Sequence, residues 1–232
     1  MTLFPETDII VTEIRHGRMD RRSIAEGKMR KTFWICCIFT VLFLGSCGYA
    51  EIREDRIEIR QDGTVRAVSY GDFPSDRYDI AALREEAEEA AEEYNLTAGE
   101  EKITFKEAVQ DGDHARVVIY YDSPEDYEAF NHVALSVRPL EEALASDSEI
   151  GNVGMRSAEG TKRTTLSSIP DPAEGEEYIL VCVSEPLRIL YAGEPVFFSG
   201  TANVDADGTV TVSFPDTVPE EERRAYIVYK LV

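Results

Sequence analysis

No hydrophobic run in this sequence reaches the length of an ordinary membrane-spanning helix. The longest run, Phe33–Leu44, is apolar at every position except Thr40. It is little more than half as long as the roughly 20 apolar residues that are needed to cross about 30 Å of hydrocarbon. We therefore expect the run to be the hydrophobic core of a cleaved segment, and an uncleaved signal anchor is the less favoured alternative.

Histidine, cysteine and tryptophan are scarce, with three, four and one residues in the chain. Beyond residue 47 the only cysteine is Cys182, whose strand-like surroundings predict a small buried hydrophobe. His114 and His132 adjoin no nucleophile motif, and the sequence has no zinc-type histidine pair and no Gly-rich phosphate loop. Asp205–Gly208 looks like a fragment of a calcium loop without its remaining ligands. The sequence accordingly predicts no catalytic, cofactor-binding or metal-ligating residues.

Positive charge is also scarce. The formal net charge is −21, and the five acids and seven bases of residues 1–46 leave 40 acids and 17 bases, a net charge near −23, in the rest. Such a chain is repelled by phosphates, which excludes nucleic acid as a partner, and by anionic lipid headgroups. The excess acid is explained by solubility, or by an unknown cationic or cell-wall partner.

The hydrophobic run belongs to a signal-like segment. Met29, Arg30 and Lys31 provide a short positive stretch before it, and small residues follow it. This order is typical of a signal peptide, which we place at residues 29–46. Residues 1–28 have mixed charge and one brief apolar patch. We expect them to be a non-native or unstructured N-terminal extension, with translation beginning at Met29.

The end of this segment, Leu44-Gly45-Ser46-Cys47, resembles the lipobox of bacterial lipoproteins. The resemblance implies that the Cys47 thiol carries a diacylglyceryl group and that cleavage makes Cys47 the first residue. It further implies a lipid-anchored protein at the outer face of the cell membrane, where the anchor alone is expected to contact the bilayer. Residues 47–55 would be a short linker that keeps the domain close to the membrane.

The residues that follow predict an α+β fold with antiparallel hairpins. Hairpins are indicated at 56–70 and 103–121, each turning on an Asp-Gly pair. Between them, residues 78–96 read as an amphipathic helix with an alanine stripe on one face and glutamates on the other. Ser123 and Pro124 begin a short helix, and another is expected at Leu140–Ala145.

The C-terminal part is dominated by strand signals. Residues 147–177 show little periodicity and many Ser, Gly, Thr and Pro, which predicts a loop or linker. Residues 178–232 contain several short apolar runs and predict a β-rich C-terminal subdomain, after an α+β subdomain at 56–146. The quartet Asp62–Val65 recurs at Asp207–Val210, which convergence on one turn chemistry explains more economically than duplication.

Taken as a whole, the part from residue 47 onward resembles small lipoproteins of Gram-positive anaerobes. The likeness lies in the lipobox, the Asp-Gly-Thr-Val hairpin followed by an Ala/Glu helix, the YYDSPEDYEAFN segment, and the ending from RILYAG to YIVYK. It implies a location at the cell surface. It brings neither an activity nor catalytic residues.

Three functions are compatible with these observations. The favoured prediction is a membrane-anchored, non-enzymatic binding or structural module. The alternative is a cell-envelope hydrolase that uses carboxylates near Ser146–Glu177, which would need two of them at catalytic separation. The third is an adhesin that depends on divalent cations, prompted by the high acid content.

Overall fold

A computed structural model describes residues 53–160 and 162–231. The predicted N-terminal extension, the signal peptide, Cys47 and most of the linker lie outside these residues. The described part contains two sheets and three α-helices, and the expected α+β class is confirmed, with strands in the majority. No helix in this part is both long enough and apolar enough to cross a membrane.

The first sheet has seven strands. In spatial order they are β11 (Ala202–Val204), β12 (Val210–Val212), β9 (Arg188–Tyr191), β1 (Arg56–Ile59), β2 (Val65–Asp72), β4 (His114–Tyr121) and β3 (Ile103–Asp111). All neighbours are antiparallel except β1 and β9, which pair in parallel. The parallel pair joins the beginning of the domain to its C-terminal third.

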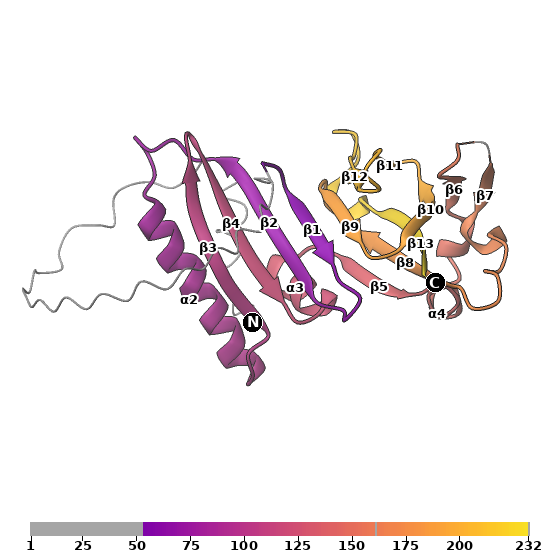
Figure 1. Ribbon diagram of the computed structural model, residues 1–232, viewed down its shortest axis with the longest axis horizontal. Helices are drawn as coiled ribbons and strands as arrows, with labels where there is room; N and C mark the ends of the chain where they lie inside the picture. The colour runs from indigo at the N-terminus through magenta and orange to yellow at the C-terminus, as the bar shows by residue number, and fades with distance from the viewer. Residues whose placement is uncertain (1–52, 161, 232) are drawn as a thin grey trace, which may run out of the picture.

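The second sheet has six antiparallel strands. In order they are β5 (Leu135–Pro139), β8 (Glu177–Val183), β13 (Ala225–Leu231), β10 (Glu194–Ser199), β6 (Gly154–Ser157) and β7 (Arg163–Thr165). The helices are α2 (Ile80–Ala98), α3 (Pro124–Asn131) and α4 (Leu140–Ser146), with 3-10 turns η2 (Ile150–Asn152), η3 (Leu166–Ser168) and η4 (Glu220–Glu222). Figure 1 shows α2 along the β3–β4 end of the first sheet and α4 at the opposite end of the molecule.

The arrangement differs from the expected subdomain boundaries in two ways. Residues 147–177, expected as a loop or linker, contain η2, β6, β7 and η3. Strands β6 and β7 have four and three residues and few apolar side chains, so no alternating pattern marks them. Both sheets also combine strands from 56–146 with strands from 178–232, because β9 pairs with β1 and β8 pairs with β5.

The asymmetric covering of the first sheet determines where polar side chains can lie. One of its faces packs against α2, α3 and the second sheet, in a single cluster that includes Ile57, Ile119, Ile189, Val181 and Ile227. A second cluster covers the far face of the second sheet with α4, η2 and η3, and includes Leu140, Leu166 and Val228. Within the described residues, no element packs on the other face of the first sheet.

Helix α2 matches its predicted amphipathic pattern. Leu83, Ala87, Ala90 and Ala91 are buried on the sheet side, and the Asp79 side chain caps the first turn by accepting a hydrogen bond from the Ala81 N–H at 2.8 Å. The helix ends at Gly99, which has a φ of 79°. This left-handed conformation favours glycine because it has no Cβ.

Helix α2 also covers the edge of β3, the outermost strand. Asn95 Nδ2 donates to the Ile103 carbonyl at 2.8 Å, while its Oδ1 accepts from the Lys102 and Ile103 N–H groups at 2.8 and 2.9 Å. Arg84 Nη2 donates to the Ala108 carbonyl at 2.9 Å. An unprotected edge strand offers unpaired backbone groups to another chain. Side chains of the helix occupy part of that edge.

The change Asn95→Ala tests this edge protection. We expect a loss of roughly 1–3 kcal/mol in the free energy of unfolding, because three hydrogen bonds disappear and their backbone partners remain. Urea unfolding followed by circular dichroism measures it. The control is Leu96→Ala, a neighbour whose side chain is 83 % exposed and whose loss is expected to change stability by less than about 0.5 kcal/mol. Equal unfolding midpoints for the two variants would contradict this account.

Candidate binding surface on the open sheet face

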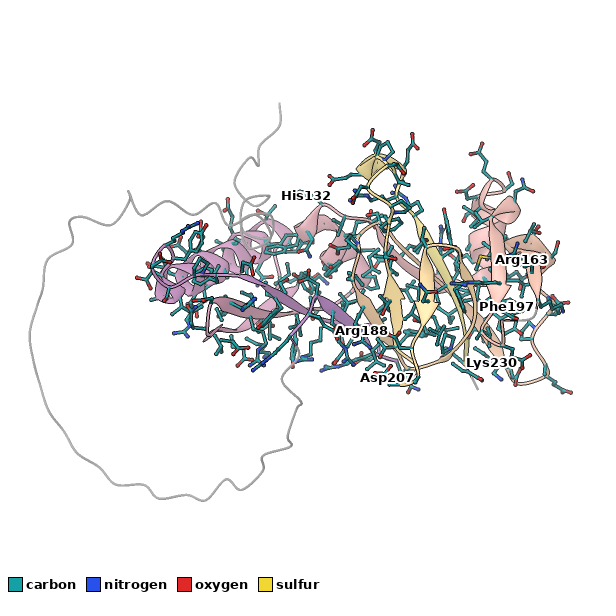
Figure 2. All side chains as sticks on the ribbon, turned by 90° about the horizontal axis from the view of Figure 1, so that it is seen from above. His132, Arg163, Arg188, Phe197, Asp207 and Lys230 are labelled. Atoms are coloured by element: carbon teal, nitrogen blue, oxygen red, sulfur yellow. The ribbon has the colours of Figure 1, made fainter. Side chains whose placement is uncertain are left out.

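The uncovered face of the seven-stranded sheet, here called the open face, is formed by side chains that alternate with the core residues. Arg56 and Glu58 flank the buried Ile57 on β1, and the strand register extends their rows across the sheet. The open face includes Arg56, Glu58, Arg66, Val68, Tyr70, Thr104, Glu107, Val109, Arg116, Val118, Tyr120, Arg188 and Leu190. Figure 2 shows Arg188 on the side of the molecule opposite His132.

Long side chains cover two of the valines of the open face, Val68 and Val118, whereas Val109 on β3 is 38 % exposed. Val68 and Val118 are only 2 % and 3 % exposed, although neither belongs to the two core clusters. In the register, Arg56 lies beside Val68 and Glu107 beside Val118. Apolar stems of charged residues can bury such surface while their heads stay in water. The open face is therefore an ordered layer of side chains.

Ion pairs fix several of these heads. Glu58 Oε1 lies 3.0 Å from Arg66 Nη1 and 3.5 Å from Arg56 Nη2, so two guanidinium groups share one carboxylate oxygen. Arg116 Nη2 lies 2.9 Å from Glu107 Oε1. The Arg66 side chain is 12 % exposed. Partial burial strengthens such pairs relative to fully exposed ones.

Tyr120 holds two further cations beside the open face. The Arg60 guanidinium and the Lys106 ammonium group lie 5.1 and 5.0 Å from the centre of its ring, within the range of a cation–π interaction. Both cationic residues are exposed. Neither makes an ion pair with another described residue.

Together these groups form a local excess of positive charge, which we call the cationic centre. It comprises Arg56, Arg60, Arg66, Lys106 and Arg116, with the carboxylates of Glu58 and Glu107 among them. Five cations thus stand against two carboxylates in a chain with a net charge of −21. The exposed glutamates of α2 lie across the sheet from it. Composition alone gave no indication of this separation of charge.

The end of the open face where the chain enters β1 is acidic, and we call it the acidic end. It contains Glu54, Asp72 and Asp111. Asp205 and Asp207, from the turn between β11 and β12, add their carboxylates beside Arg188. Arg188 bonds to Glu54 at 2.5 Å and to Asp205 at 3.0 Å. Partial burial opposes the charged form of Arg188, but the Glu54 hydrogen bond and the nearby carboxylates raise its pKa.

His114 and His132 belong to different parts of the fold, β4 and the end of α3, and each has a local structural role. His114 stacks on Tyr70 with 5.0 Å between ring centres, and its Nε2 is 3.2 Å from Asp72 Oδ1. His132 ends α3 with a φ of 54°, a left-handed conformation. His114 thus has an aromatic ring and a carboxylate as its partners.

A buried carboxylate, Glu185, was not anticipated. It is 3 % exposed in the turn between β8 and β9, and it accepts a hydrogen bond from the Tyr127 hydroxyl of α3. Burial, with a smaller contribution from the charge of Glu185, raises the pKa of Tyr121 well above its usual range. One carboxylate among so many acids carries no recognisable sequence signal. Its contacts tie α3 to the second sheet.

The acids of residues 147–177, which the hydrolase alternative would use, are mostly exposed, in contrast to the buried Glu185. Asp147, Glu149, Glu159 and Asp171 are exposed, and half-buried Glu176 lies 3.7 Å from Lys230 Nζ. The described residues also contain no group of three or more His, Cys, Asp or Glu that is arranged to hold a metal ion. Nothing in this segment favours the hydrolase over a binding module.

Comparison with known proteins adds no functional assignment. No protein-family model, curated protein or solved structure matches the chain. Any functional argument therefore rests on the sequence motifs and on the geometry of the described residues.

Cys182 lies on β8 and is half-buried. Burial raises the pKa of its thiol to about 11, an effect that the positive charge of Arg224 and the neighbouring Tyr226 reduce. Since the thiolate is the nucleophile, such a thiol is largely unreactive at neutral pH.

We expect iodoacetamide to label Cys182 very slowly at pH 7, where about one thiol in 10⁴ is ionised. The rate should rise with pH until the thiol titrates near pH 11. Peptide mass spectrometry reads this residue separately from the other cysteines. Labelling of urea-unfolded protein is the control and should be fast at pH 8.5. Rapid labelling of folded protein at pH 7 would contradict the assigned environment.

Proposed function

We propose that the chain is a lipid-anchored, non-enzymatic binding module at the outer face of a cell membrane, and that the open face is its binding surface. The lipobox-like sequence that ends at Cys47 supports the anchor. The observation that carries the binding role is the uncovered sheet face, which presents ordered arginine and tyrosine side chains.

Two properties of the open face support a binding role. Arginine and tyrosine are enriched at the energetically important positions of protein interfaces. Their side chains here are also held in place by ion pairs and ring contacts, which lowers the entropy that binding costs. An uncovered face that served solubility alone would need no such ordering.

The prediction of a cationic partner concerns a different surface. The exposed glutamates Glu85, Glu88, Glu89, Glu92 and Glu93 line α2 on the other side of the sheet. An exposed acidic helix face is ordinary for a soluble domain. We therefore place the binding function on the open face.

The anchor is tested by the intact mass of the protein, expressed with its own signal and extracted from membranes. We expect a species that begins at Cys47 and carries a diacylglyceryl group, because the Cys47 thiol is the predicted attachment site. Cys47→Ala should abolish the modification. The matched control, Cys37→Ala, changes a cysteine inside the predicted signal and should leave it intact. An unmodified chain that retains residues 29–46 would contradict the proposed anchor.

A further inference from the structure

We infer that the cationic centre binds a flexible polyanion of the cell surface, a wall polymer built from phosphodiester-linked units. The inference rests on the proposed function, because it deepens the binding role of the open face and assumes an outward location. The argument uses three features of this face: its uncompensated charge, the spacing of its cations, and its position relative to the chain entry.

The cationic centre has positive charge that its own carboxylates do not neutralise. Arg56 and Arg66 share the single carboxylate of Glu58. Arg60 and Lys106 contact the Tyr120 ring and make no ion pair with the other described residues. Asp62, in the turn after Arg60, hydrogen-bonds to Thr64 and also interacts electrostatically with Arg60, but it forms no ion pair with Arg60 in the described structure. An incoming anion therefore meets two exposed cations, Arg60 and Lys106, that are already positioned by the Tyr120 ring.

The spacing of the cations suits a ligand with repeated anionic groups. The Arg60 guanidinium lies at the Tyr120 ring, and Tyr120 pairs with Arg66 on the neighbouring strand, which is about 4.8 Å away. Arg66 and Arg116 extend the group across β2 and β4. Guanidinium groups match phosphate oxygens in geometry. A polymer can engage several of them at once, and the linked contacts strengthen one another.

The shape of the charge distribution selects a narrow ligand. The cationic centre is a small area on a chain with a net charge of −21. A rigid nucleic-acid duplex or a broad anionic surface would meet the surrounding carboxylates as well, and these would repel it. A flexible single polymer chain can contact the cationic centre alone.

The position of the acidic end argues against a lipid surface as the ligand. Arg53, the first described residue, lies 3.1 Å from Asp111 in that end. Cys47 precedes Arg53 by six residues, which reach at most about 20 Å. An anchored domain would therefore turn its acidic end toward the bilayer. Arg60, which follows the last residue of β1, lies at the opposite end of that strand, whereas Arg56 and Arg116 lie nearer the acidic end.

The test measures the affinity of fluorescent poly(glycerol phosphate) for the full chain, reconstituted on phosphatidylcholine vesicles. The variant Arg60→Gln with Lys106→Gln removes two exposed charges that make no ion pair in the described structure, so the fold should persist. We expect about tenfold weaker binding, because two phosphate contacts are lost, and weaker binding by every form at higher salt.

The matched control is Lys162→Gln with Arg163→Gln, two exposed cations near β7 in the other sheet. It makes the same change in net charge and should bind as the unchanged protein does. Equal affinity for the two double variants would overturn the inference, and so would the absence of binding by the unchanged chain at low salt.

A second arm separates the polymer from the lipid surface. The Cys47→Ala chain, which lacks the proposed anchor, is mixed with phosphatidylglycerol vesicles without polymer, and we expect no vesicle binding. Vesicle binding that Arg60→Gln with Lys106→Gln abolishes would mean that the cationic centre recognises anionic lipid, which overturns the inference. The intact mass decides the anchor independently. If the chain carries no lipid but still binds the polymer through Arg60 and Lys106, the proposed location is wrong and the proposed class of ligand is retained.

Discussion

The structure depends on the packing of the six-stranded sheet, α2 and α3 against a single face of the seven-stranded sheet. The parallel pairing of β1 with β9 makes this possible, because it places C-terminal strands beside the first strand of the domain. Residues such as Ile57, Ile189 and Ile227 then meet in one core. Apolar burial of this kind is the dominant favourable contribution to folding. Its one-sidedness leaves the opposite face uncovered.

That uncovered face explains how a strongly acidic protein comes to carry a cationic surface. Charged residues on β1, β2 and β4 alternate with core residues, so every one of them points to the same side. Acidic residues concentrate on α2 across the sheet. The open face and the exposed face of α2 differ in charge because the periodicity of strands and helices places particular residues on each face. The net charge of the chain therefore describes neither surface.

Local elements could be predicted from the sequence, and long-range pairing could not. The Asp-Gly turns, the alanine stripe of α2 and the Ser123 cap of α3 are each encoded within a few residues. The β1–β9 pair joins segments that are more than a hundred residues apart, and no local pattern specifies it. The cationic centre was missed for the same reason: Arg60, Arg116 and Lys106 come together only through the sheet register. Glu185 gave no signal because acids are common in this chain.

The central claim, that the open face is occupied at the cell surface, is tested most directly by acylating exposed lysines with a water-soluble reagent. Lys106 lies in the cationic centre, and Lys162 is an exposed lysine near the other sheet. The account predicts that both are modified in purified protein, and that Lys106 alone is protected in intact cell envelopes. Equal modification of Lys106 in the two preparations would contradict it.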